Sequence, residues 1–415
     1  RSTQYSSSAA SDCDNRQGEK FKMNKKYIKA GNLIDGTGNS IMQNKGIIID
    51  GDTIVEIEDI RDDLNGYDVY DYLDKTVMPG IMNCHVHLTM EPVGNPKIYY
   101  DNVSDVELVV NTIKQLDAYL DSGVTYIRSL GCPKYVDVQL KNLIDKGSID
   151  GPGIVTSGPV ICMTGGHGYY FGIESDGVDE CRKSARTVLK NGVDCVKIMA
   201  TGGVTTDGVE PGSPQLTLEE MKAAVDEAIK AGKITATHAQ GRTGIKNAVL
   251  AGITSIEHGV YLDDEIIDLM LERGTYLVPT VAAPYFILNA GKESGITEAT
   301  LRKCEIVAIP HKESFLKAYK KGIKIAVGSD AGTSYNEHGK TYYEMKLMSD
   351  YGMDNMDIIV AATKTASELL RIDKNYGTLE KGKKADVIVV NGNPVEDIDV
   401  LADVLAVFKL GKKVR

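Results

Sequence analysis

Apolar and polar residues follow two different patterns along this chain. Between Val77 and about Leu370, short apolar runs typical of buried strands alternate with stretches in which apolar positions recur every three or four residues. Runs of the first kind lie at 76–87, 123–130, 153–159, 193–200, 233–239, 253–259, 275–280 and 323–330. Helical periodicity that ends in a glycine marks 105–123, 217–232, 263–274 and 312–322.

Eight such alternations of strand and helix predict an α/β fold of the (β/α)8 TIM-barrel type over residues 77–371. The active site of such a barrel lies at the C-terminal ends of its strands. A doubly wound open sheet is the structural alternative.

The two ends of the chain show a different sequence pattern. Residues 25–73 contain short β-rich runs separated by Gly, Asn and Asp turns, which predict a small antiparallel sheet, and 383–394 and 404–414 look similar. Because neither piece has enough strands to be stable alone, we expect 23–76 and 372–415 to form one discontinuous β-sandwich domain. The polar, Ser-rich residues 1–22 are expected to be a flexible tail or to precede a natural start at Met23.

Composition narrows the class of protein. Hydrophobic residues at 42% and charged residues at 25% are typical of a folded globular chain. A net charge of -11 without a basic cluster excludes nucleic acid and anionic membranes as expected partners, which leaves a small-molecule substrate. Seven scattered cysteines without a C-x-x-C pair, and the absence of a run of roughly 18 apolar residues, predict a cytoplasmic protein. We also expect a homo-oligomer.

Unusual polar residues fall where the expected strands end. Side chains two apart in a strand share a face, so His85 and His87 can both point into the barrel mouth. Any one of these residues has an ordinary structural explanation, such as a hydrogen-bonded core histidine or a helix-capping aspartate. Their joint placement instead predicts a metal site made by His85, His87, Lys197, His238, His258 and Asp330.

Lys197 interrupts an apolar strand, on the same face as Cys195 and Met199. A lysine seldom lies in a buried strand without a partner, and a paired carboxylate is the ordinary explanation. The functional alternative is that burial deprotonates the amine, which adds carbon dioxide and becomes a carbamate able to bridge two divalent metal ions. Imidazole and carboxylate ligands suit zinc first, and also manganese or cobalt.

Two metal ions about 3.5 to 4 Å apart can hold a bridging hydroxide and polarise a carbonyl. Asp330 is then expected to orient that hydroxide and to pass its proton to the leaving amine, first as a general base and then as a general acid. The chemistry that these residues imply is hydrolysis, with Asp330 and Lys197 as the catalytic candidates.

Five segments, "PGIMNCHVHL", "VKIMATGGV", "THAQG", "SIEHG" and "VGSDAGT", together resemble the amidohydrolase superfamily. The resemblance covers nearly everything after Met23 and is to the metal-dependent dipeptidases (Xaa-Pro or Xaa-Arg/Lys, prolidase-like) related to imidazolonepropionase. It implies that His85 and His87 hold one metal with Asp330, that His238 and His258 hold the second, and that carboxylated Lys197 bridges them. Two positions depart from the family: Asn83 replaces a common Asp, and Gln240 stands where related dipeptidases have Tyr or His.

Substrate-binding candidates are fewer. A glycine-rich loop at 162–172 carries His167 and Tyr169, although an ordinary flexible loop is the alternative. The resemblance implies that His167 and the backbone around Val204 bind a substrate carboxylate, a role that exposed backbone amides favour. Gln240 and His338 are further candidates. We expect 282–310 to shape the pocket and His311 to begin a helix on the outside.

These observations favour a binuclear metal-dependent amidohydrolase that cleaves the amide bond of a dipeptide or an N-acyl amino acid, in the manner of a carboxypeptidase or prolidase. A related hydrolase of a non-peptide amide, carbamate or lactone is the alternative. A mononuclear deaminase is disfavoured because Lys197 would have no role in it. A catalytically dead scaffold is disfavoured because such a barrel should have lost ligands, and none is missing here.

Overall fold

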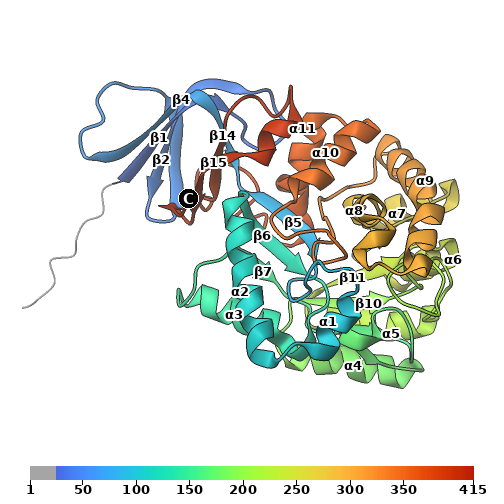
Figure 1. Ribbon diagram of the computed structural model, residues 1–415. Coiled ribbons are helices and arrows are strands. Elements are labelled where there is room, and N and C mark those ends of the chain that lie inside the picture. Colours follow the sequence, from blue (N-terminus) through green and yellow to red (C-terminus); the bar gives the residue numbers. More distant parts are fainter. Residues whose placement is uncertain (1–24) are drawn as a thin grey trace, which may run out of the picture.

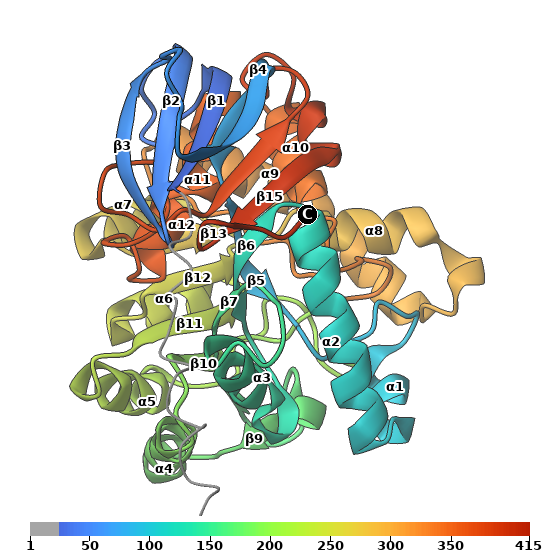
Figure 2. The same cartoon turned by 90° about the vertical axis from the view of Figure 1, so that its left-hand side faces the viewer.

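The computed structural model describes residues 25–415, so the tail expected at 1–22 lies outside the described residues. A terminal β-sheet stands beside a larger region in which strands and helices alternate (Figure 1). The same division is visible in the view turned by 90° (Figure 2). The domain boundaries given above stay a prediction.

The terminal sheet combines strands from both ends of the chain in the order β16-β15-β14-β4-β1-β2-β3. Hydrogen bonds connect all seven described strands into one sheet, because the long β4 pairs with β1 along one edge and with β14 along the other. Apolar residues of β1, β2 and β3 pack against those of β14 and β15 in one core cluster. The β1–β4 pair is parallel, so this sheet is mixed and not purely antiparallel as expected. Its strands are β1 (Lys25–Leu33), β2 (Met42–Asp50), β3 (Thr53–Asp59), β4 (Tyr67–Pro79), β14 (Val387–Val390), β15 (Val404–Lys409) and β16 (Lys412–Lys413).

The central region contains two sheets of parallel strands. One has the order β5-β6-β7, and the other the order β13-β12-β11-β10-β8-β9. Strands that follow each other in the chain are mostly neighbours, and the order turns back only at the edge strand β9, whereas a doubly wound sheet reverses its order at an inner switch point. The strands are β5 (Ile81–Val86), β6 (Val124–Ser129), β7 (Gly153–Val155), β8 (Val160–Cys162), β9 (Gly172–Glu174), β10 (Cys195–Met199), β11 (Ile234–Ala239), β12 (Ser255–His258) and β13 (Tyr276–Val278).

The strands assigned within residues 25–415 do not close into one continuous eight-stranded barrel. The eighth expected strand, 323–330, makes only an isolated bridge to β13, although the amide of Leu277 donates to Lys324 O (3.0 Å) and that of Cys84 to Val327 O (2.8 Å). Gly328 approaches β13 so closely that an added Cβ would lie 2.4 Å from Val278 Cγ1, and Asp330 has a left-handed φ of 61°. The left-handed backbone of Asp330 ends the extended conformation that a strand requires.

Helices follow most of the parallel strands and lie around them (Figure 2). The expected helices at 105–123, 217–232 and 263–274 correspond to α2, α5 and α7, whereas the one at 312–322 is only the end of the longer α9. The helices are α1 (Pro96–Asn102), α2 (Asp105–Asp121), α3 (Val136–Asp145), α4 (Val178–Lys190), α5 (Leu218–Lys230), α6 (Arg242–Ala251), α7 (Asp264–Arg273), α8 (Ala282–Ala290), α9 (Glu298–Lys320), α10 (Tyr342–Tyr351), α11 (Asn355–Ala362) and α12 (Lys364–Leu369).

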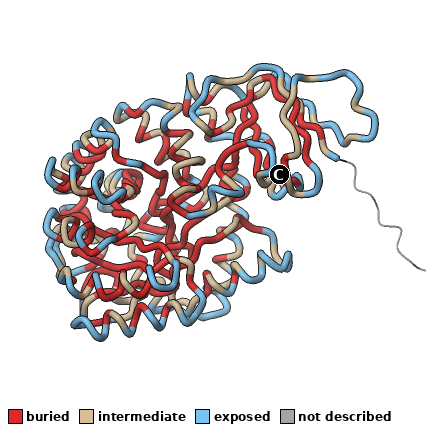
Figure 3. The backbone as a smooth tube through the Cα atoms, turned by 180° about the vertical axis from the view of Figure 1, so that it is seen from behind, coloured by how far each residue is buried: buried red, intermediate tan, exposed pale blue. Residues whose placement is uncertain are grey.

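Burial is concentrated in the central strands and in the middle of the terminal sheet (Figure 3). The six cysteines within the described range are all free and buried, and Cys13 lies outside it. No helix between residues 25 and 415 combines the length and the apolar character that crossing a membrane would demand. The central core thus gives a rigid frame to the ends of the parallel strands, where the polar residues of interest lie.

Candidate metal centre and active site

The six residues expected to bind metal are brought together at the C-terminal ends of the parallel strands. All six are buried and line one pocket of about 670 Å³, a volume that includes its open mouth. Five of them lie in or directly after β5, β10, β11 and β12, and the sixth is the last residue of the segment 323–330. They are His85, His87, Lys197, His238, His258 and Asp330.

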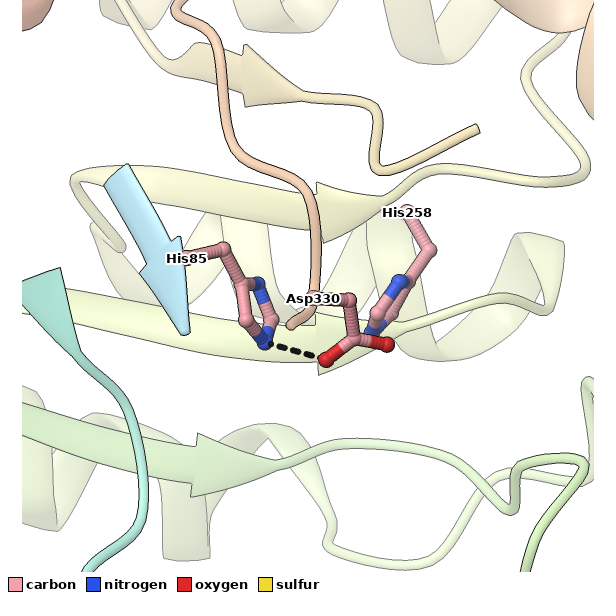
Figure 4. A group of neighbouring side chains, drawn as sticks. All are labelled: His85, His258 and Asp330. Atoms are coloured by element: carbon pink, nitrogen blue, oxygen red, sulfur yellow. Dashed lines mark ion pairs between the residues drawn. The ribbon is translucent and has the colours of Figure 1, made fainter. Parts of the chain in front are cut away.

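Asp330 lies at the centre of this group. Its Oδ1 is 3.2 Å from Nε2 of His85 and 3.0 Å from Nε2 of His87. Potential ligand atoms of His85, His258 and Asp330 all lie within 4.8 Å of one another, and the three side chains converge from separate elements (Figure 4). The ring of His238 is next to this group, with its centroid 4.5 Å from that of His258. Such a spacing of imidazole and carboxylate donors is suited to a divalent cation.

Several polar atoms in the pocket have no hydrogen-bond partner within the described part of the chain. They are Nδ1 of His87, Nζ of Lys197 and Oε1 of Gln240, whereas Nε2 of His85 and Oδ1 of Asp330 lie close to each other (3.2 Å) without good hydrogen-bond geometry. A buried polar atom left without a partner costs about 1–3 kcal/mol, and a cluster of such atoms is rare in a purely structural core. Most of them belong to expected metal ligands, so the donor set fits bound cations.

Hydrogen bonds behind three of the histidines fix which ring nitrogen faces the pocket. Nδ1 of His85 donates to Oε2 of Glu257 (2.8 Å), which leaves Nε2 free. Nδ1 of His258 donates to the hydroxyl of Thr280 (2.6 Å), because that hydroxyl donates to a backbone carbonyl. Nε2 of His238 donates to Gly202 O (3.1 Å), which leaves Nδ1 free. Partners of this kind orient metal-binding imidazoles and raise their basicity.

The backbone is strained at two of the expected ligands. His258 and Asp330 have φ values of 72° and 61°, in the left-handed region that residues other than glycine rarely adopt. Each such residue costs about 1–3 kcal/mol, and such strain is concentrated at functional sites. This strained backbone conformation holds the two side chains toward the pocket.

Protonation states also suit metal binding. Burial holds the pKa values of His238 and His258 well below their ordinary range, so both rings are neutral. Burial raises the pKa of Asp330, but His85 and His87 outweigh that effect and keep it well below its usual value. Burial lowers the pKa of Lys197 to about 8, against the opposing influence of nearby carboxylates.

An ion pair that sequence reasoning missed lies beneath the site. Arg128 of β6 and Glu257 of β12 are both fully buried, with NH2 2.9 Å from Oε1. Arg128 also donates to Cys84 O (2.6 Å) and to the hydroxyl of Ser255 (3.0 Å). Burial raises the pKa of Glu257, but Arg128 and His85 reverse the effect and lower it to about 2. The only signal in the sequence was a charged residue inside each of two apolar strands.

The substrate-binding candidates divide into two groups. His167, Val204 and Gln240 line the pocket, and the centroid of the His167 ring is 4.2 Å from that of His238. Tyr169 and His338 are not among the described residues that line it. Tyr169 borders a neighbouring pocket, whereas Tyr170 borders both. Both ring nitrogens of His338 are engaged, by the Tyr119 hydroxyl (2.7 Å) and by Met90 O (2.9 Å).

The expectation that His311 begins a helix on the outside is wrong. His311 lies within α9, is 3% exposed and lines the pocket. Its Nε2 donates to Pro279 O (2.6 Å), which ties α9 to the segment after β13. The tract 282–310 shapes the pocket as expected, since α8 and α9 contribute Ala283, Pro284, Ile287 and Val307 to its lining.

Asn83, one of the two departures from the family, has a structural task. Its side-chain amide donates to the hydroxyls of Ser329 (2.7 Å) and Thr341 (2.9 Å), and its Oδ1 accepts from the amide of Ser329 (3.1 Å). The same oxygen accepts from the amide of His85 (3.2 Å). Asn83 therefore links β5 to the segment that carries Asp330 and does not enter the pocket.

Several known proteins resemble this chain over most of its length. The amidohydrolase family model matches residues 76–414. A Xaa-Pro dipeptidase with methionine bound in its active site superposes with a TM-score of 0.88 at 35% identity, over 94% of this chain and 100% of that one. A prolidase in complex with N-methylphosphonate-L-proline gives 0.88 at 28% identity, over 94% and 99%. Ochratoxinase from Aspergillus niger is 29% identical over 428 residues, which cover 93% of this chain and 85% of that protein. The chain therefore belongs to the amidohydrolase family, as its motifs indicated, and is a hydrolase of amide C–N bonds.

Proposed function

We propose that the chain is a binuclear metal-dependent amidohydrolase that cleaves the amide bond of a dipeptide or an N-acyl amino acid. The observation that carries this proposal is the convergence in one pocket of buried ligand-type atoms on His85, His87, Lys197 and Asp330, of which Nζ of Lys197 and Nδ1 of His87 have no hydrogen-bond partner among the described residues. The related dipeptidase and prolidase hold methionine and a proline derivative, both of which carry an amino-acid carboxylate. In this proposal the two parallel sheets and 323–330 form the wall of a (β/α)8 barrel, with the pocket at its mouth.

Each group in the pocket has an assigned task. His85 and His87 would hold one ion with Asp330, and His238 and His258 the second. Lys197 would bridge them after its amine lone pair attacks the carbon of carbon dioxide and the nitrogen loses a proton. Two divalent ions, zinc in the first instance, supply Lewis acidity that polarises an amide carbonyl and lowers the pKa of water.

Asp330 is the proposed proton carrier. Its carboxylate is ionised, since its pKa is held well below the usual range, and its Oδ1 contacts only the ring nitrogens of His85 and His87 among the ion pairs of the described residues. An ionised, partly uncommitted carboxylate can accept a proton from water and deliver it to the leaving amine. The left-handed backbone at Asp330 keeps this group turned toward the pocket.

The carboxylate of the substrate is assigned to His167 and the backbone near Val204. The turn before Val204 needs glycine, because a Cβ on Gly203 would lie 2.6 Å from the His167 ring and 2.8 Å from that of His238. Nδ1 of His167 is held by the hydroxyl of Thr206 (2.8 Å). Lys303, which donates to Thr206 O (2.7 Å), adds positive potential near this end of the pocket.

Replacing His167 with alanine is expected to raise KM roughly tenfold for substrates with a free carboxylate, as expected for the loss of one hydrogen bond to a charged group. For the matching substrates with an amidated carboxyl group, KM should change little. Steady-state kinetics on both members of each pair measures the effect. An equal rise in KM for free and amidated substrates would count against the assignment.

Purified protein supplied with zinc is expected to retain about two ions per chain and to release amino acids from members of a library of dipeptides and N-acyl amino acids. Elemental analysis and amine detection measure these results, with Asp330→Asn as the control for contaminating hydrolases. Retention of well under one ion per chain would instead favour a dead scaffold. The homo-oligomer and the cytoplasmic location stay predictions, and light scattering tests the first.

A further inference from the structure

The pocket is poor in charge once the proposed metal ligands are set aside. Among the described residues that line it, Lys197 and Asp330 alone carry a charge apart from the histidines, and both belong to the proposed ligand set. The His167 ring is held by the Thr206 hydroxyl (2.8 Å), and the His311 ring donates to Pro279 O (2.6 Å). A charged substrate side chain would therefore find no ionic partner in the lining.

Four charged residues just outside the lining are committed to other contacts. Arg128 and Glu257 are paired with each other. Nζ of Lys303 donates to Thr206 O. The carboxylate of Glu344 accepts from the backbone amides of Val281 (3.0 Å) and Ala282 (2.7 Å) at the start of α8. Recruiting any of them to a substrate would break a buried interaction, which is costly.

The wall formed by α8 and α9 is instead apolar. Ala283, Pro284 and Ile287 of α8 line the pocket with Val307 of α9, whereas Asn289 lies on the exposed side of α8. Burying an apolar side chain against such a wall gains about 25 cal/mol per Å² of apolar area. Burying an unpaired charge there costs several kcal/mol. Both effects favour an uncharged, apolar substrate group at this wall.

We infer that the substrate presents an uncharged apolar side chain to the wall formed by Ala283, Pro284, Ile287 and Val307, and that amides of lysine, arginine, aspartate and glutamate are excluded. The inference rests on the proposed function and makes it more specific. Of the two kinds of dipeptidase that the motifs resemble, it rules out the Xaa-Arg/Lys type for this chain.

A matched substrate series tests the inference. The Nα-acetyl and glycyl derivatives of norleucine, glutamine, glutamate and lysine share a backbone, a carboxylate and an unbranched side chain of similar length. For the zinc-loaded protein, kcat/KM for norleucine should exceed that for lysine and for glutamate at least about 100-fold, with glutamine between them. Comparable values across the series would overturn the inference and leave the proposed function standing. No turnover of any member would overturn the proposed function and the inference with it.

A charge placed on the wall should change the preference. Ala283→Asp is expected to shift the ratio of kcat/KM for lysine over norleucine at least about tenfold toward lysine, because the new carboxylate supplies the missing partner. Asn289→Asp adds the same charge on the exposed side of α8 and should leave the ratio unchanged. Val307→Asp, from α9, serves as the second variant if thermal melting shows that Ala283→Asp does not fold. An unchanged ratio in a folded, metal-loaded wall variant would refute the contact.

Discussion

Replacing Lys197 with alanine is expected to abolish metal bridging and to lower kcat/KM roughly 1,000-fold or more, while the fold persists. The Lys197 side chain is 1% exposed, and its Nζ has no hydrogen-bond partner among the described residues. Its removal therefore breaks no hydrogen bond of the amine to the described residues. What is lost is the proposed anionic bridge, on which several kcal/mol of transition-state stabilisation would depend.

Elemental analysis, steady-state kinetics and thermal melting measure the three parts of this result. Lys197→Met is the matched variant, because it fills the volume in β10 with an unbranched apolar side chain and separates loss of the amine from creation of a cavity. Both variants should lose metal and activity, and the methionine variant should melt no lower than the alanine variant. Full turnover by either variant would refute the bridging role.

The strands that carry the site could be predicted because their signals are local. The apolar runs that end near His238 and His258 can be recognised in the sequence, and so can the lysine inside the apolar run 193–200. The irregularity of the expected eighth strand could not be recognised in the sequence, because the left-handed backbone of Asp330 is set by the packing of the fold. Tertiary contacts of this kind override a strand-like pattern.

Two other features depend on residues far apart in the chain. Arg128 and Glu257 each look like an isolated charge in an apolar strand, and only the fold pairs them. A helix was expected to begin at His311, but α9 runs from Glu298 to Lys320 and contains Pro310. Pro310 has no backbone N–H and so removes one hydrogen bond from α9. The helix nevertheless continues, with Val307 and His311 packed against the pocket, and no local sequence pattern predicts this packing.

Arg128→Met is expected to lower the free energy of unfolding by about 3–5 kcal/mol at neutral pH, because it leaves the fully buried carboxylate of Glu257 without its cation. Denaturant unfolding of the metal-free protein measures the change. Arg186→Met is the matched control: Arg186 also forms an ion pair with a glutamate, but its side chain is 61% exposed, so little change is expected.

The pH dependence separates loss of a charge pair from loss of packing. In the unmodified protein the pKa of Glu257 is lowered from 4.5 to about 2, so the pair contributes stability that is fully present above pH 4.5 and is lost as the pH falls toward 2. In Arg128→Met, burial acts without the arginine and favours the protonated carboxyl group. The destabilisation should therefore be largest at neutral pH and shrink on acidification, and adding Glu257→Gln should recover part of it. A deficit that stays constant with pH would mean that Arg128 acts mainly through packing.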